Sequence, residues 1–141
     1  MAQDRSRRRS SPDRASSPGG DRPPVAIGHV FLSATAVATA ATWLERVGLR
    51  PIFKGDDVAV LELRGGTHVV VTPAERPPAK GSAAPFDLMV DDIEAARLAC
   101  AADGLKPTRI RHGSIHASFR LAGPDGYIFT IVSSHAGDRV V

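Results

Sequence analysis

Runs of apolar residues, separated by short turns that contain Gly or Asp, define the elements predicted for the first part of this chain. Residues 25–33 (VAIGHVFLS) are apolar and partly β-branched, which predicts a strand. Over residues 36–47 the apolar side chains return at steps of three and four, which predicts a helix that Thr35 caps and Gly48 ends. Three more strands are predicted, at residues 50–54, 58–63 and 67–72.

The same order of elements follows again after a linker. Residues 73–85 (PAERPPAKGSAAP) are rich in Pro and Ala and show no hydrophobic period, as is typical of a connection. The second helix is predicted over residues 93–103, with Asp91 or Asp92 as its cap and Gly104 at its end. Four strands accompany this helix, at residues 86–90, 105–111, 114–121 and 127–133.

A local repeat indicates that the chain is duplicated. The motif GLRP at residues 48–51 recurs as GLKP at residues 104–107, at an offset of 56. The offset becomes 60 between the last strands, because the second hairpin is longer. The sequence therefore predicts an α+β domain (25–141) made of two tandem βαβββ modules, at residues 25–72 and 86–135, joined by the linker at residues 73–85.

The first 24 residues differ in composition from the rest of the 141-residue chain. After Met1 they contain no aromatic side chain and no aliphatic side chain larger than Ala, so they cannot bury enough apolar surface to offset chain entropy. They carry six Arg and three Asp, and subtracting these from the chain's 18 basic and 15 acidic residues leaves twelve of each. We therefore expect a disordered basic tail at residues 1–24 in front of a neutral domain, with nucleic acid contacted only non-specifically by the tail. An alternative is that this tail is the functional part and tethers the domain to a polyanion.

Two features bear on the compartment of the protein. Residues 23–44 carry no formal charge and follow an Arg cluster, which is the outline of an export signal. The stretch also contains His29, Ser33 and several Thr, and its first part matches a strand of the second module. The single Cys100 gives no disulfide, suits a reducing compartment and lies among Ala and Leu as a core thiol would. We predict a cytoplasmic protein without a membrane segment, with export as the alternative.

Three short motifs carry a family likeness. They are GHV at residues 28–30, VDDIEAA at 90–96 and GPDG at 123–126. With these motifs and the duplicated order of elements, the chain resembles the vicinal oxygen chelate superfamily, which includes glyoxalases, extradiol dioxygenases and bleomycin-resistance proteins. The resemblance implies two βαβββ modules whose curved sheets form an open, barrel-like cleft, and it implies a homodimer.

The resemblance also allows a test for a metal site. Enzymes of this superfamily hold a divalent metal with one residue from the first strand and one from the last strand of each module, and these positions fall on His29, Val70, Pro85 and Thr130. Only His29 suits this role, since Val and Pro cannot ligate and a Thr hydroxyl is a poor ligand on its own. We therefore expect no metal at the usual site and no other cofactor. The alternative is one divalent metal ion at a displaced site formed by His29, His68, His116 and Asp87.

Alternation along the predicted strand at residues 114–121 suggests which side chains contact a ligand. Its apolar members are expected to pack on a helix, which directs His116, Ser118 and Arg120 toward the cleft, where Arg120 can meet a carboxylate or phosphate. The candidate ligand contacts are His29, His68, Asp87, His116, Ser118, Arg120 and Thr130. These features favour a metal-free, small-molecule-binding protein of the drug-sequestering type. The alternative is a glyoxalase-type lyase, isomerase or dioxygenase in which His29 and His116 transfer protons.

Overall fold

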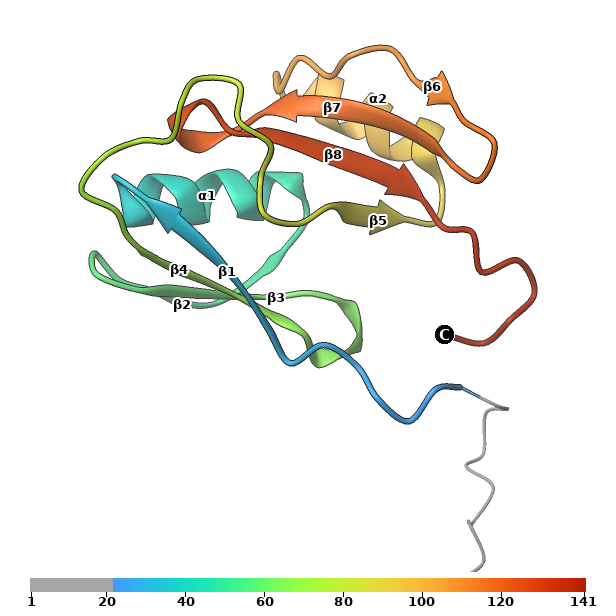
Figure 1. Cartoon of the computed structure of the whole chain (residues 1–141), viewed down its shortest axis with the longest axis horizontal. Coiled ribbons are helices and arrows are strands. Elements are labelled where there is room, and N and C mark those ends of the chain that lie inside the picture. The colour runs from blue at the N-terminus through green and yellow to red at the C-terminus, as the bar shows by residue number, and fades with distance from the viewer. Residues whose placement is uncertain (1–21) are drawn as a thin grey trace, which may run out of the picture.

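The computed structural model describes residues 22–141 as two four-stranded sheets and two helices (Figure 1). The predicted disordered tail, with the alternative role in binding a polyanion, lies outside the described residues except for residues 22–24, which are exposed. The first module contains β1 (His29–Ala34), α1 (Val37–Val47), β2 (Arg50–Lys54), β3 (Ala59–Glu62) and β4 (His68–Pro73). The second module contains β5 (Leu88–Val90), α2 (Ile93–Ala102), β6 (Arg111–His112), β7 (Ala117–Ala122) and β8 (Ile128–Ser133).

Both sheets have the same topology, which confirms the duplication. The strand order is β1-β4-β3-β2 in the first sheet and β5-β8-β7-β6 in the second, and in each module the first and last strands pair in parallel. The helices begin at Val37 and Ile93, and the last strands begin at His68 and Ile128, so the predicted offsets of 56 and 60 hold. The α+β fold of two tandem βαβββ modules with open sheets is confirmed.

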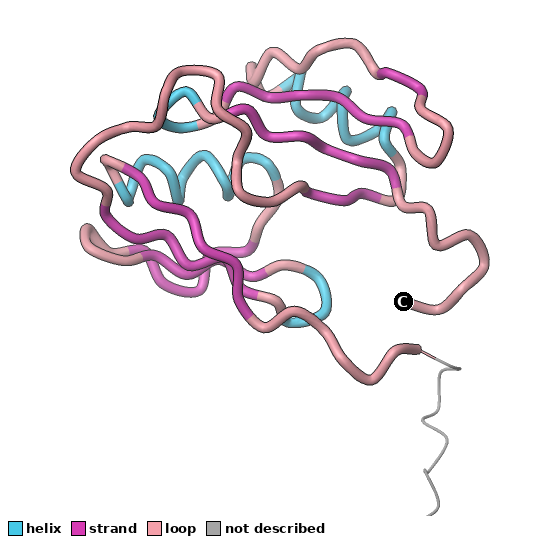
Figure 2. Tube along the Cα trace, viewed as in Figure 1, coloured by secondary structure: helices cyan, strands magenta, loops and turns pink. Residues whose placement is uncertain are grey.

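Helices cover only one face of each sheet. In the first sheet, Leu32, Leu61 and Val69 have no exposed surface and lie on the face that contacts α1. In the second sheet the buried face contacts α2, and it also receives Trp43 of α1, whose ring centroid lies 4.7 Å from that of Phe129. The helix α1 therefore lies between the two sheets, as the ribbon and the tube both show (Figures 1 and 2). We call the opposite, helix-free side of each sheet its open face.

The first strand begins later than predicted. β1 starts at His29, and residues 25–28 are exposed and carry no strand. From His29 to Leu44, the segment weighed as an export signal builds β1 and most of α1, and it places Leu32 and Leu44 in the core. Within residues 22–141, no helix is long and apolar enough to cross a membrane.

The two helices are capped differently. Ala36 is the N-cap of α1 and offers no side-chain hydrogen bond, so the prediction that Thr35 caps this helix is wrong. At the other end Gly48 takes a φ of +130° and its N–H bonds carbonyls of the last turn, as predicted. In α2, Asp92 is the cap, since its carboxylate accepts the N–H of Ala95 at 2.9 Å.

The strand predicted at residues 105–111 is wrong except at Arg111, because the strand formed here, β6, contains only Arg111 and His112. Lys106 takes a φ of +54°, which turns the chain away from extended geometry, and Pro107 has no N–H to give to a neighbouring strand. The chain is held here by Thr108, whose N–H donates to the carbonyl of Arg120 while its hydroxyl accepts the Arg120 N–H at 2.8 Å. The Thr108 hydroxyl thus accepts a hydrogen bond that a backbone carbonyl would accept if this segment were a strand paired with β7.

The next strand also starts late. β7 begins at Ala117 rather than at residue 114, because the N–H of Gly113 bonds the carbonyl of His116 at 3.0 Å and closes a loop over residues 113–116. His116 therefore lies in a loop, and the predicted alternation holds only from Ala117 onward. Ile115, expected to pack on a helix, is 71% exposed.

The predicted linker is ordered by pairing with the last strand. Ala83 forms an isolated parallel bridge to Ile128. The N–H of Ile128 donates to the carbonyl of Ser82 at 2.8 Å, and the N–H of Ala84 donates to the carbonyl of Ile128 at 2.9 Å. The end of the linker therefore runs along β8 before β5 begins.

Candidate functional site

Four polar side chains form one row across the open face of the first sheet. The register pairs His29 with His68, His68 with Glu62, and Glu62 with Arg50, from β1 through β4 and β3 to β2. The next residue on β4, Val69, is buried against α1, so alternation places the row on the opposite side of the sheet. We call these four residues the polar row.

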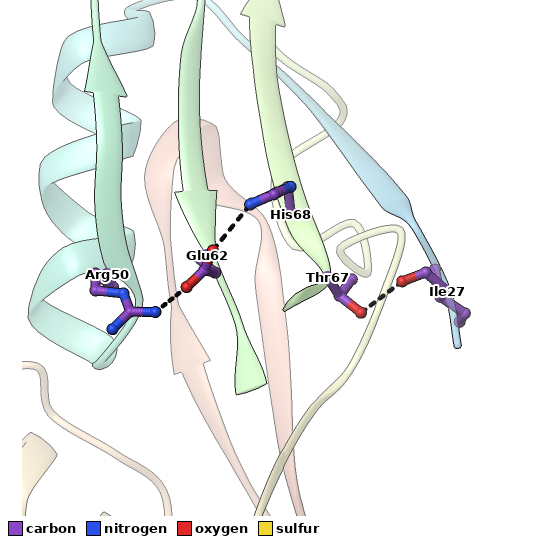
Figure 3. Close-up of polar contacts among 5 residues, drawn as sticks. All are labelled: Ile27, Arg50, Glu62, Thr67 and His68. Carbon is purple, nitrogen blue, oxygen red and sulfur yellow. Dashed lines mark hydrogen bonds and ion pairs between the residues drawn. The ribbon is translucent and has the colours of Figure 1, made fainter. Parts of the chain in front are cut away.

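Glu62 is the centre of the polar row (Figure 3). Its Oε2 lies 3.1 Å from Nε2 of His68, and its Oε1 accepts a hydrogen bond from Nη2 of Arg50. The hydrogen bond from Arg50 and then that from His68 hold the pKa of the Glu62 carboxyl below its ordinary value. Glu62 is therefore a carboxylate at neutral pH, and it fixes the orientation of the His68 ring.

The chain before β1 is tied to β4 beside the polar row. The hydroxyl of Thr67 donates to the carbonyl of Ile27 at 2.6 Å (Figure 3), and the N–H of His68 donates to the carbonyl of Gly28 at 3.0 Å. These bonds hold the His29 ring beside the His68 ring, with centroids 5.8 Å apart and planes inclined by 34°. Two of the candidate contact residues are thus neighbours.

An apolar row runs next to the polar row on the same open face. The register pairs Phe31 with Val70, Val70 with Val60, and Val60 with Phe53. Phe31 is 61% exposed and Phe53 is 55% exposed, so both aromatic rings are in solvent in the single chain. The open face of the first sheet therefore combines a hydrogen-bonded ionic row with an uncovered apolar row.

A basic hollow lies on the second sheet. It has a volume of about 360 Å³ and is formed by β6, the loop at 113–116 and the start of β7. Its walls are residues 111–116, Ser118 and Arg120, which supply four basic side chains (Arg111, His112, His116 and Arg120) and no carboxylate. Among the described residues, no ion pair involves any of these four side chains. We call this feature the basic hollow, and its charge favours an anion.

The candidate contact residues fall into two groups on two sheets. His29 and His68 are together in the polar row, while the other group, His116, Ser118 and Arg120, lines the basic hollow. Thr130 pairs with Arg120 on the neighbouring strand, and Asp87 is exposed just before β5; neither lines the hollow. The seven candidates are therefore divided between the two modules.

The positions tested for metal binding follow the same division. His29 and Val70 belong to the first sheet, Pro85 ends the linker, and Thr130 belongs to the second sheet. The displaced set of His29, His68, His116 and Asp87 is not gathered at one point either, since nowhere in residues 22–141 do three His, Cys, Asp or Glu side chains come together to hold a metal ion. His29 and His68 are the one pair of this set that the register makes adjacent.

Four residues with a charged or imidazole side chain on the polar row and in the basic hollow were not among the sequence candidates, namely Arg50, Glu62, Arg111 and His112. Arg50 and Glu62 lie on correctly predicted strands, but their pairing depends on a register shift between Pro51 and Phe53 that no hydrophobic pattern marks. Arg111 and His112 had a usable signal, because residues 109–116 contain four basic or imidazole side chains and no acidic one. A local charge pattern of this kind indicates an anion site from residue types alone.

Comparison with known proteins identifies the fold. No family model matches the sequence, and no curated protein matches it. Among solved structures, the lactoylglutathione lyase of Agrobacterium tumefaciens matches with a TM-score of 0.65 and 16% identity, over 84% of this chain and 100% of that one. The bleomycin resistance determinant of transposon Tn5 matches with a TM-score of 0.60 and 18% identity, over 78% of this chain and 98% of that one. A glyoxalase/bleomycin resistance protein/dioxygenase from Alicyclobacillus acidocaldarius matches with a TM-score of 0.62 and 18% identity, over 80% of this chain and 94% of that one.

These structures share one architecture, so the protein has the fold of the vicinal oxygen chelate superfamily, as the sequence resemblance predicted. At these identities the likeness defines the fold, and the activity has to be argued from the residues of this chain.

Proposed function

We propose that this protein binds a small organic anion in the basic hollow and works as a small-molecule-binding protein without the usual metal site. The observation that carries the proposal is the set of four basic side chains around one concave surface without a carboxylate. The replacements at Val70, Pro85 and Thr130 support the absence of metal from the usual positions, because these side chains cannot supply a ligand set.

The chemistry of the hollow favours a carboxylate or a phosphate group on the ligand. Arg111 and Arg120 offer guanidinium groups, which bind such anions through paired N–H donors. The hydroxyls of Ser114 and Ser118 add neutral donors in the same walls. Ile115 is largely exposed at this surface and gives the apolar part of a ligand a contact. An anion with a hydrophobic body therefore fits the hollow better than an inorganic ion.

The test is calorimetric titration of the full chain with benzoate and with phenyl phosphate at low ionic strength. We expect a Kd of about 1 mM or tighter, and a loss of about tenfold in each of Arg111→Gln and Arg120→Gln. Arg76→Gln is the matched control, since it removes the same charge from an exposed residue that does not line the hollow. Equal binding by all three variants, or no binding by the wild type, would remove the basic hollow as the ligand site.

The homodimer implied by the superfamily likeness belongs to the same proposal. The apolar row leaves Phe31 and Phe53 exposed, and the neighbouring Ile52 is 54% exposed. Such a contiguous apolar face is typical of a surface that another protein covers. A second copy of the chain is the partner that the likeness implies, and it would bury this face.

A metal-dependent enzyme is the second candidate, and one observation favours it. His29 and His68 are adjacent, and Glu62 holds the His68 ring as an outer carboxylate holds many metal-bound imidazoles. Proton transfer shared by His29 and His116 has less support, because His29 lies on the first sheet and His116 lies in the loop at 113–116 of the second module. The metal content of the purified full chain tests this candidate.

A further inference from the structure

A second cavity lies between the modules. It has a volume of about 360 Å³ and is a partly open space lined by the end of α1, residues 62–64, the middle of α2 and strands β5, β7 and β8 of the second sheet. Its inner wall is made by five side chains that are each at most 6% exposed, namely Leu49, Leu88, Cys100, Phe119 and Ile131. We call it the inter-module cavity.

The duplication explains why side chains leave this space unfilled. At the offset of 56, Trp43 and Leu44 of α1 correspond to Ala99 and Cys100 of α2. Trp43 packs on Phe129 of the second sheet and Leu44 has no exposed surface, so these positions of α1 fill the space around the helix. Ala99 and Cys100 both line the cavity and are much smaller. The second helix therefore keeps the position of the first but lacks the side chains that would fill the space beneath it.

The charges at the cavity mouth are already compensated. Arg64 pairs with Asp91 at 2.7 Å, and Arg46 pairs with Asp103 at 2.8 Å. The remaining charged group at the mouth, Glu62, is held by Arg50 and His68 of the polar row. A charged ligand would have to break one of these pairs, whereas a neutral ligand leaves them intact.

The inner wall excludes ionic chemistry as well. Burial, and to a lesser degree the charge of Asp103, raises the pKa of the Cys100 thiol, so the sulfur is neutral and behaves as an apolar surface. Walls of Leu, Ile and Phe accept molecules such as benzene, and small-molecule sites begin at about 300 Å³. The apolar inner wall and the volume of the inter-module cavity therefore favour a neutral, apolar compound.

We propose that the inter-module cavity binds a small, neutral, apolar ring compound of one or two rings. This site is independent of the basic hollow, which takes an anion on another surface, and neither proposal needs the other. Ligand binding between the modules would stabilise the contact of α1 and α2 with the second sheet.

The experiment uses toluene and naphthalene as probes of the full-length wild type. We expect saturable shifts of the amide NMR signals of Ala96, Cys100, Phe119 and Ile131, and a rise in Tm of about 3–6 °C near ten times the Kd. Cys100→Leu copies Leu44 of the first module and should weaken binding by about tenfold or more by filling the space. Ala101→Leu adds bulk to an exposed position of α2 outside the cavity and should leave binding unchanged.

Several outcomes would overturn the proposal. These are no saturable shifts in the wild type, shifts that map outside the cavity, or equal binding by Cys100→Leu and Ala101→Leu. If Cys100→Leu does not fold, Ala99→Leu takes its place, and the map of shifts in the wild type decides by itself. Arg120→Gln separates the two sites, since it should weaken benzoate binding and leave toluene binding unchanged.

Discussion

The carboxylate of Asp125 receives two hydrogen bonds from Thr35, one from its backbone N–H at 2.7 Å and one from its hydroxyl at 2.5 Å. The two residues are 90 positions apart. Thr35 stands just before α1 in the first module, and Asp125 stands in the turn before β8 in the second, at a φ of +57°. This contact joins the start of α1, which packs against both sheets, to the turn before β8 in the second module.

Removing this contact should destabilise the protein. We expect Thr35→Val to lower the free energy of unfolding by about 1 kcal/mol, because it keeps the shape and loses the hydroxyl. Asp125→Ala should cost more, about 2 kcal/mol, since it removes both hydrogen bonds and places Ala at a positive φ that Asp tolerates better. Urea unfolding measures both changes, with Thr42→Val, at an exposed position of α1, as the control for the Thr35 change. A double mutant whose cost equals the sum of the single costs would show that the contact contributes no coupling energy.

The polar row should be visible in the titration of Glu62. Its pKa is lowered in the fold, so the stabilisation it gives is fully present above the ordinary pKa of 4.5 and is lost as the pH falls through the lower, folded value. The hydrogen bond from Arg50 is the largest cause of the lowered pKa of Glu62. Arg50→Gln weakens this interaction and removes the positive charge, so it should raise the pKa of Glu62 toward its ordinary value. Carbon-13 NMR of the Glu62 carboxyl checks this, with Arg76→Gln as a change of equal charge elsewhere. A Glu62 titration that is the same in both variants would contradict the role of Arg50.

The apolar row gives a prediction about assembly. Phe31→Asp and Phe53→Asp place charges on the exposed face of the first sheet and should shift a dimer toward monomer in sedimentation velocity runs across a range of protein concentrations. Leu98→Asp is the control, because Leu98 is 66% exposed on α2, away from this face. A wild type that is monomeric throughout, or a dimer that survives both Phe substitutions, would show that a second copy does not cover the apolar row.

Metal binding separates the two functional proposals. For a metal-free binding protein, the full chain purified without a tag or chelator should carry no stoichiometric metal and should bind Zn²⁺, Ni²⁺, Mn²⁺ and Fe²⁺ more weakly than about 1 μM. One tight ion per chain would support the enzyme instead, provided that it is lost in His29→Ala and in His68→Ala. His112→Ala is the control, since His112 lies on the other sheet and its loss should not change binding to the polar row.

Elements with a strong local signal were predicted well. The apolar steps of α1 and the glycine at its end predicted the helix within one residue, and the short turn residues separated β2, β3 and β4 correctly. The predictions that were wrong concern places where a distant contact or an unusual backbone angle overrides the local pattern. Thr35 has the side chain of a helix cap, yet its hydroxyl donates to Asp125 of the other module. Residues 105–110 have strand-like composition, yet Lys106 turns the chain there.

The candidate site was predicted less completely than the fold. Alternation placed Ser118 and Arg120 on one face, and both line the basic hollow, which His116 joins through the loop at 113–116. No local pattern connects Glu62 with Arg50 and His68, because that row depends on the register of three strands. The sequence therefore indicated several of the side chains to consider, while their division between two surfaces depended on strand pairing.

Residue types and local spacing were enough to establish the duplicated βαβββ order, the lack of ligand chemistry at Val70, Pro85 and Thr130, and the small side chains of α2. The folded arrangement was needed to establish that α1 lies between the sheets, that the histidines are divided between two faces, and that Ala99 and Cys100 border a cavity. Strand register and the packing of one module on the other are set by contacts between residues far apart in the chain, and no local pattern encodes those distances.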